Sequence, residues 1–135
     1  MRRRHVTSGT EWESRVGYSR AVRVDDRVVV SGTTATDEDG AVVAPGDAER
    51  QARRALTNVV TALEEAGSGR EDVVRTRLFV TDIDDWQAIG DVHGEFFGDV
   101  RPAATMVEVS RLVDPELVVE VEAEAVVGSG SGFEK

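Results

Sequence analysis

Residues Leu117 to Val127 read LVVEVEAEAVV, and this run decides the class of fold. Its apolar residues alternate with glutamates: Val119, Val121 and Ala123 with Glu120, Glu122 and Glu124. Because successive side chains of a strand point to opposite faces, this period of two predicts a strand with one apolar face. Residues Thr105 to Arg111 follow Pro102 and show the same alternation at Val107 and Val109, which predicts another strand.

Upstream of these runs, two β-rich segments surround an acidic pair. Residues 18–24 and 27–32 flank Asp25 and Asp26, an arrangement typical of a hairpin. A short strand is predicted at residues 41–43, before Pro45 and Gly46. Residues 73–80, VVRTRLFV, predict a longer strand in the second half of the chain.

Two segments have the spacing of amphipathic helices. Asp47 is a favourable N-cap for the first helix, and Gly67 is a favourable end. Between them, apolar residues recur at helical spacing: Ala48, Ala52, Ala55, Leu56, Val59, Val60 and Leu63. The second helix is expected to have Asp84 as its cap and to stop near Gly98. It carries Trp86, Ile89, Val92, His93, Phe96 and Phe97.

The predicted order is β-β-β-α-β-α-β-β, an α/β domain with a mixed sheet and two helices on one face. We expect one domain over residues 1–127, with residues 1–16 as a loosely ordered extension and residues 128–135 as a flexible Gly/Ser tail. No third helix is available to cover the other face of the sheet. The alternating runs make that face too apolar for water, which predicts self-association.

Composition excludes several classes of function. The chain has 135 residues, no cysteine and a net charge of −10, and Lys135 is its one lysine. An acidic surface repels phosphate backbones, so no nucleic acid is expected as a partner. Two histidines and scattered carboxylates give no metal-ligand spacing. No apolar run reaches membrane-spanning length and no signal peptide is visible, so we expect a cytoplasmic protein without a membrane partner.

Several segments, taken in order, resemble the RidA/YjgF family over residues 17–127. Residues 17–22, GYSRAV, are similar to the family's P-Y-S-Q-A-V, and residues 30–33, VSGT, to its S-G-Q region. Further matching segments are residues 66–67, 74–82, 94–97, 101–103, 107–112 and 119–123. Each fragment is weak alone, whereas the ordered set is specific.

The resemblance implies a chorismate-mutase-like fold and a homotrimer with sheets inside and helices outside. It implies sites in clefts between neighbouring subunits that bind a small molecule. Archetypal members hydrolyse imines and enamines to a keto acid and ammonia, without metal or cofactor. We therefore expect a metal-free and cofactor-free site.

The resemblance also assigns roles to individual residues. Glu120 falls on the family's water-positioning glutamate, Tyr18 on the tyrosine of the cleft, and Ser31-Gly32 on a turn in the pocket wall. A solvated strand glutamate and an interface aromatic are the alternative interpretations of Glu120 and Tyr18.

Four positions depart from the family's pattern. Ala104 replaces the arginine that binds the substrate carboxylate, Gly90 an asparagine, His93 a tyrosine, and Thr33 a glutamine. An alternative interpretation of His93 is a packed helix histidine. Thr105, beside the lost arginine, is a candidate hydroxyl donor. An arginine that forks onto a buried carboxylate is worth about 2–5 kcal/mol, so the usual substrate is expected to bind poorly.

Three arginines are candidates to replace the missing cation: Arg20, Arg77 and Arg101. Arg20 stands where the family has glutamine, and Arg77 is expected to pair with an acidic residue of an adjacent strand, such as Glu122.

Two functions remain open. The first is a diverged hydrolase or deaminase that needs no cofactor, and the second is a non-catalytic binding or interaction module. Ribonuclease activity, sometimes attributed to the family, ranks third because no basic groove or histidine pair is present.

Overall fold

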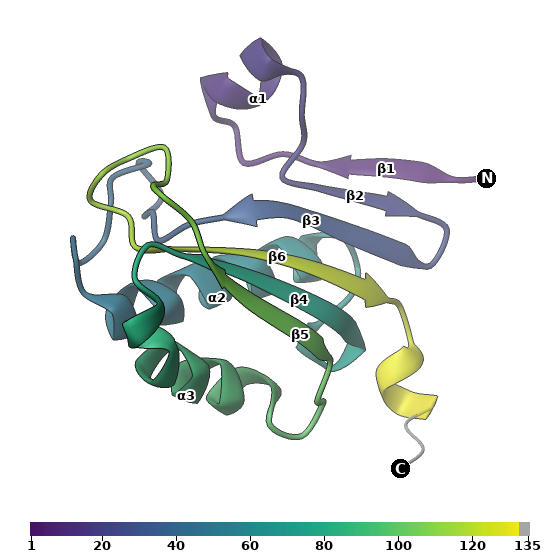
Figure 1. Cartoon of the computed structure of the whole chain (residues 1–135). Coiled ribbons are helices and arrows are strands. Elements are labelled where there is room, and N and C mark those ends of the chain that lie inside the picture. Colours follow the sequence, from purple (N-terminus) through teal and green to yellow (C-terminus); the bar gives the residue numbers. More distant parts are fainter. Residues whose placement is uncertain (133–135) are drawn as a thin grey trace.

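The computed structural model describes residues 1–132, which form one mixed sheet with helices (Figure 1). The strands are β1 (Arg3–Val6), β2 (Ala21–Val24), β3 (Arg27–Thr33), β4 (Val73–Val80), β5 (Ala103–Glu108) and β6 (Val119–Val126). The α-helices are α1 (Glu11–Val16), α2 (Ala48–Glu65) and α3 (Trp86–Phe97). Short 3-10 turns are η1 (Arg70–Asp72), η2 (Ile83–Asp85) and η3 (Ser129–Gly132).

The six strands lie in the order β1-β2-β3-β6-β4-β5. Every neighbouring pair is antiparallel except β4 and β5, which run parallel and are connected through α3. The hairpin of β2 and β3 turns at Asp25 and Asp26, and Asp25 takes the left-handed conformation with φ 51°. The α/β class, the mixed sheet and the hairpin are confirmed.

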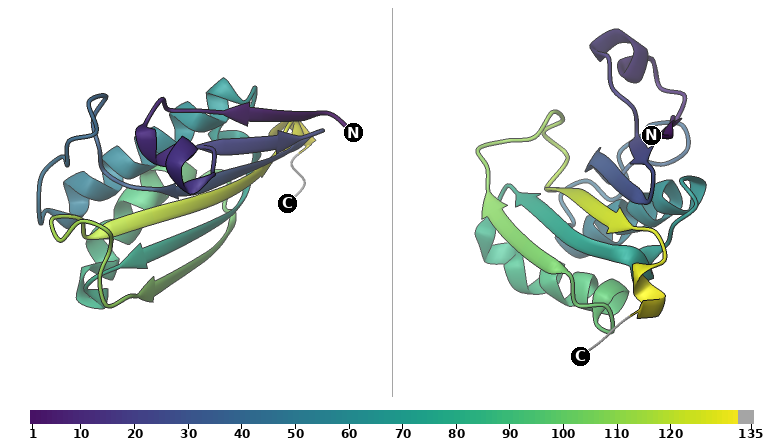
Figure 2. Two further views of the ribbon diagram at one scale, coloured as in Figure 1. Left: turned by 90° about the horizontal axis from the view of Figure 1, so that it is seen from above. Right: turned by 90° about the vertical axis from the view of Figure 1, so that its right-hand side faces the viewer.

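Helices α2 and α3 both lie on one face of the sheet (Figures 1 and 2). The side chain of Asp47 accepts a hydrogen bond from Arg50 N at 3.0 Å, as its N-cap role predicted. At the other end, Gly67 has φ 85° and Ser68 N donates to Leu63 O, which closes the helix with a glycine in the left-handed region. The apolar stripe of α2 is buried against the sheet.

The start of α3 differs from the prediction. Asp82, rather than Asp84, caps the segment, because its side chain accepts from Asp84 N at 2.9 Å and begins η2. Helix α3 then starts at Trp86, after Asp85, with no side-chain cap. The sequence offers three aspartates within four residues, and only the backbone path selects between them.

The uncovered face of the sheet is charged rather than apolar, which corrects the expectation. The alternating apolar residues of β6 are buried under the helices. The opposite face carries ion pairs: Arg27–Glu124 at 2.5 Å, Arg75–Glu124 at 3.5 Å and Arg77–Glu122 at 3.4 Å. Val29 and Val107 remain about two-fifths exposed. Since a period of two supplies one apolar set, the helices take that set and leave the glutamates uncovered.

Both chain ends carry more regular structure than expected, and one predicted strand is absent. Residues 1–16 contain β1, paired along β2, and α1, which stands away from the sheet (Figures 1 and 2). Residues 41–43 form no strand, and Val42 makes only an isolated bridge with Thr36. Residues 129–132 form η3, and Gly130 N donates to Asp72 Oδ1 at 3.0 Å. Residues 133–135 of the expected tail lie outside the described residues.

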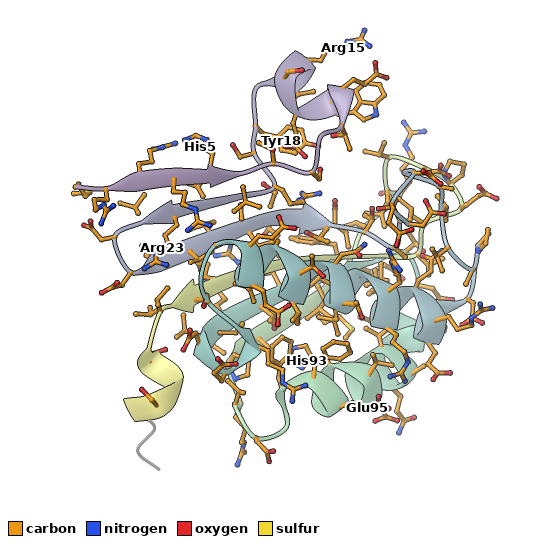
Figure 3. All side chains as sticks on the ribbon, turned by 180° about the vertical axis from the view of Figure 1, so that it is seen from behind. His5, Arg15, Tyr18, Arg23, His93 and Glu95 are labelled. Carbon is orange, nitrogen blue, oxygen red and sulfur yellow. The ribbon has the colours of Figure 1, made fainter. Side chains whose placement is uncertain are left out.

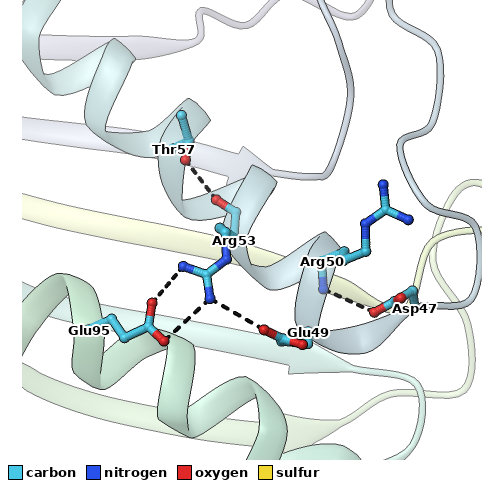
Figure 4. Close-up of polar contacts among 6 residues, drawn as sticks. All are labelled: Asp47, Glu49, Arg50, Arg53, Thr57 and Glu95. Carbon is cyan, nitrogen blue, oxygen red and sulfur yellow. Dashed lines mark hydrogen bonds and ion pairs between the residues drawn. The ribbon is translucent and has the colours of Figure 1, made fainter.

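A surface ion-pair cluster joins the two helices (Figure 4). Arg53 of α2 contacts Glu95 of α3 at 2.5 Å and Glu49 of its own helix at 3.3 Å. The hydrogen bond from Arg53 lowers the pKa of Glu95. All three side chains are exposed, so this cluster adds little to the stability of the fold.

No helix within residues 1–132 is long and apolar enough to cross a membrane.

Gln51 is the polar residue on which the packing of α2 depends most. It is fully buried, and its amide donates to Glu116 O at 2.8 Å and Ala44 O at 3.2 Å. Its Oε1 accepts from Val118 N at 2.8 Å. One side chain thus holds the loops before α2 and before β6 against the helix.

We expect the substitution Gln51→Met to lower the free energy of unfolding by about 2 kcal/mol, because at nearly constant volume it leaves the Val118 N–H unpaired and removes one of two donors from Glu116 O and from Ala44 O. Chemical denaturation measures the change. Thr57→Ala, at an exposed position of the same helix (Figure 4), is the control and should change it by less than about 0.5 kcal/mol. Equal effects of the two substitutions would contradict the role assigned to Gln51.

Candidate functional site

A β-bulge in β3 brings Gly32 against Glu120. Val30 pairs with Ala123 and Thr33 with Val121, so Ser31 and Gly32 together occupy the space of one residue. A Cβ built on Gly32 would lie 2.8 Å from Glu120 Oε2. Only glycine therefore allows the carboxylate of Glu120 to lie against the backbone of β3 in this position.

Glu120 stands alone on a face where the other glutamates are paired. Its side chain is half-buried, and within residues 1–132 no group donates a hydrogen bond to it. Burial raises the pKa of Glu120 and the nearby Glu122 raises it further, while Arg20 opposes both effects. A carboxylate with a raised pKa and free oxygens can hold a water molecule and accept its proton.

Arg20 lies next to this carboxylate. Its Nη2 donates to Gly32 O at 2.6 Å, and its Cζ lies 5.9 Å from the centroid of the Tyr18 ring. Its Nε is buried and has no hydrogen-bond partner in the described chain. Glu120, Gly32, Arg20 and Tyr18 therefore form one cluster at the end of the β2–β3 hairpin.

The edge strand β1 holds the backbone of this cluster. His5 Nδ1 lies 2.7 Å from Ser19 Oγ, and Ser31 Oγ donates to Ser19 O at 2.6 Å. Arg20 N also donates to Val6 O. The sequence analysis missed His5 and Ser19, because the polar residues around His5 show no alternation that would signal a strand.

Thr33 supports the bulge instead of facing the cluster. It is buried, and its hydroxyl donates to Ser31 O at 2.7 Å. Sequence reasoning placed it in the binding surface, where the family has a glutamine. In this chain its hydroxyl is occupied inside the protein.

His93, Ala104 and Gly90 lie on the other side of the sheet. His93 Nε2 is 2.8 Å from Thr76 Oγ1, and Thr76 is fully buried beneath the helices. Ala104 is the register partner of Thr76, so it shares this helix-covered side at the exposed edge strand β5. Gly90 lies one turn before His93 on α3 with open space around it. In Figure 3, His93 and Tyr18 lie far apart.

His93 is half-buried, and burial lowers its pKa. Its ring packs against Phe97, with the centroids 4.8 Å apart. A neutral imidazole that contacts Thr76 and Phe97 agrees with a packed helix histidine, while one edge remains accessible beside α3.

The three candidate arginines differ in their surroundings. Arg77 pairs with Glu122, as expected from its strand position, and Thr105 is its register partner on the uncovered face. Arg101 is exposed, with φ 55°, in the turn before β5. Arg20 is the one of the three that approaches Glu120.

A hollow of about 450 Å³ lies on the helix side, between α2, the loop after β1 and the loop after β3. Arg54, Asn58 and Thr36 line it, and Arg54 Nε donates to Thr36 O at 2.9 Å. Arg20 and Thr33, which the sequence placed in the binding site, also line this hollow, whereas Glu120 does not. Within residues 1–132 no three His, Cys, Asp or Glu side chains are grouped so that they could hold a metal ion.

We expect Glu120→Gln to raise the Tm at pH 7. The folded-state pKa of Glu120 lies above the unfolded value, so the stability it contributes is present at acid pH and is lost as the pH rises through the folded pKa. Glutamine does not ionise, so the difference from the parent should vanish below about pH 4. Thermal unfolding at several pH values measures it.

Glu124→Gln is the matched control on the same strand. The hydrogen bond from Arg27 lowers the pKa of Glu124, so its contribution is present at neutral pH and is lost as the pH falls through the folded pKa. This variant should therefore have a lower Tm at pH 7. If both variants shift the Tm in the same direction, the environment assigned to Glu120 is wrong.

The sequence and the fold of this chain both match those of known proteins. The sequence profile of the family described as "Endoribonuclease L-PSP" matches residues 9–127. The Mycobacterium tuberculosis protein Rv2704, described as a member of the YjgF/YER057c/UK114 family, is 48% identical. Its structure has a TM-score of 0.85 over 93% of this chain and 100% of that one.

Two further relatives are more distant. An uncharacterised protein of Streptomyces coelicolor is 40% identical over 93% of each chain. The Escherichia coli protein TdcF, whose structure contains bound serine, is 31% identical, with a TM-score of 0.74 over 81% of this chain and 87% of that one. The profile match and these identities over most of the length show that the chain belongs to the RidA/YjgF (YjgF/YER057c/UK114, endoribonuclease L-PSP) family.

Proposed function

We propose that this protein hydrolyses an imine or enamine of a small metabolite, with Glu120 holding the attacking water. The observation that carries this proposal is the unpaired, half-buried carboxylate of Glu120 against Gly32, on a face where Glu122 and Glu124 are neutralised by arginines. Leaving one carboxylate without a partner costs stability, and such sites are typical of catalytic groups.

The chemistry needs one carboxylate and one water. The water oxygen attacks the imine carbon while Glu120 takes one of its protons and passes it to the nitrogen, which gives a neutral carbinolamine. Glu120 then takes the hydroxyl proton of the carbinolamine and delivers it to the nitrogen as the C–N bond breaks, so that a carbonyl compound and ammonia leave. An enamine first gains a proton on carbon and loses one from nitrogen to become the imine. No redox partner is required, and the carboxylate ends in its starting state.

We propose further that a second copy of the chain completes the site in a homotrimer. Glu120 and Arg20 lie on the uncovered side, whereas His93, Gly90 and Ala104 lie on the helix side near the edge strand β5. These two groups cannot line one cleft within a single chain. A cleft between the uncovered face of one copy and the β5 edge of the next would bring them together.

Charge supports association through the uncovered face. In a chain of net charge −10, Arg27, Arg75 and Arg77 pair with Glu122 and Glu124 on that face. Copies of an acidic protein repel each other least where the local charge is balanced. We expect sedimentation equilibrium to give three times the chain mass of 14.6 kDa, and a monomer at every concentration would contradict this assembly.

The alternative function is a non-catalytic binding module on the same scaffold. It is favoured by Ala104, a methyl group at the position of the family's carboxylate-binding arginine. TdcF with bound serine is a relative that holds a small amino acid. In this alternative, the protein would bind a small ligand in the same cleft and would not convert it.

The deciding experiment traps enzymatically generated 2-aminoacrylate with semicarbazide and compares the parent with Glu120→Gln and Ala104→Arg. We expect activity in the parent, and a loss of about 100-fold or more in Glu120→Gln, because the variant cannot accept the proton of water. Glu124→Gln, on the same strand, should keep full activity. If the parent is inactive and the Ala104→Arg variant is active, the cleft of the parent binds a different ligand. Inactivity of all variants in folded trimers would favour the binding module.

A further inference from the structure

We infer that Arg20 binds the carboxylate of the ligand and so takes the role left open by Ala104. This inference rests on the proposed ligand, a small imine or carbonyl compound with a carboxylate. It places the cation on the same chain as Glu120, with a guanidinium that donates to the backbone of Gly32 beside that carboxylate. Both ends of the ligand would then be held by one chain, on the hairpin of β2 and β3 and on β6.

The first argument is the number of unused donors on Arg20. A guanidinium has five N–H donors in a rigid fork. Within residues 1–132, one of them is used, by Gly32 O, and the buried Nε has no partner. The three other N–H groups, on Nη1 and Nη2, have no hydrogen-bond partner in the described part of the chain, and a bound anion would pair with them.

The second argument is comparison with the arginines on the same face. Arg27 and Arg75 pair with Glu124, and Arg77 pairs with Glu122. Arg20 forms no ion pair in the described part of the chain, although Glu120 lies close enough for the guanidinium to lower its pKa. Arg20 and Glu120 are therefore neighbours that form no ion pair with each other, so the guanidinium is not neutralised as the other three are.

The third argument is that Arg20 is held in place before any ligand binds. Its backbone N–H donates to Val6 O, and its carbonyl accepts from Ser31 N. Its guanidinium is held between Gly32 O and the ring of Tyr18. A side chain fixed in this way loses little conformational entropy on binding, which favours its use for recognition.

The ligand class follows from these groups. One guanidinium binds one carboxylate bidentately, and an adjacent carboxylate disfavours a second negative charge. A small monocarboxylate with a neutral carbonyl or imine beside it satisfies both conditions. A dicarboxylate or a phosphate places more charge next to Glu120 and Glu122 than one arginine can balance.

The test measures binding of pyruvate and of pyruvamide, which differ only at the carboxylate, by isothermal titration to the parent, Arg20→Gln and Arg75→Gln. We expect pyruvate to bind the parent at least about tenfold more tightly than pyruvamide, or about 1.4 kcal/mol. Arg20→Gln should remove this preference and leave pyruvamide binding within about twofold, while Arg75→Gln changes neither. Pyruvamide binding also reports that Arg20→Gln is folded.

Arg20→Lys keeps the charge without the fork and should retain part of the preference. The inference is overturned if Arg20→Gln and Arg75→Gln weaken pyruvate binding equally, or if the parent does not prefer pyruvate. The trapping assay with Glu120→Gln judges the catalytic proposal separately. If the preference for pyruvate depends on Arg20 but the protein has no hydrolase activity, the result would support the inference about Arg20 and contradict the proposed imine hydrolysis.

Discussion

The pairing of β6 with β3 on one side and with β4 on the other is the constraint on which the structure depends. Its register puts Val119, Val121 and Ala123 beneath α2 and α3, and it puts the three glutamates on the uncovered face. A shift by one residue would exchange the two sets, burying carboxylates under the helices. The same register aligns Glu122 with Arg77 and Glu124 with Arg75, so the core and the charge pattern of the uncovered face are decided together.

The bulge at Ser31 and Gly32 is the local exception to this regularity, and the candidate site is built around it. The extra residue interrupts the β3–β6 ladder opposite Glu122, and the absence of a Cβ at Gly32 allows the carboxylate of Glu120 to approach. Glu120 therefore lies next to the bulge, and within residues 1–132 it has no arginine partner. The candidate catalytic group is the one glutamate of β6 that the sheet does not neutralise.

The distribution of charge gives this site a consistent role in an acidic protein. A chain with 26 acidic and 16 basic residues repels anions over most of its surface, so an anionic ligand needs a local cation. Arg20 supplies it from the hairpin, whereas the arginines at positions 27, 75 and 77 are occupied by glutamates. In the proposed site a carboxylate would be held by Arg20 rather than from position 104, where this chain has alanine. The fold of the family does not by itself decide this chemistry, which depends on a few side chains.

The alternation of residues 117–127, the helical spacing after Asp47 and the Asp25–Asp26 turn determined the α/β class, the hairpin and the first helix from the sequence alone. These features are local, because side-chain period and capping act within a few residues. The ordered family segments also singled out Glu120, Tyr18 and Gly32 as residues of one site. Only the tertiary structure decided the rest. It showed that β1 is an edge strand holding Ser19 through His5, that Thr33 is turned inward, and that Ala104 and His93 lie across the sheet from Glu120. Strand pairing, and the side of the sheet that a residue faces, come from contacts between residues far apart in the chain, which no local pattern encodes.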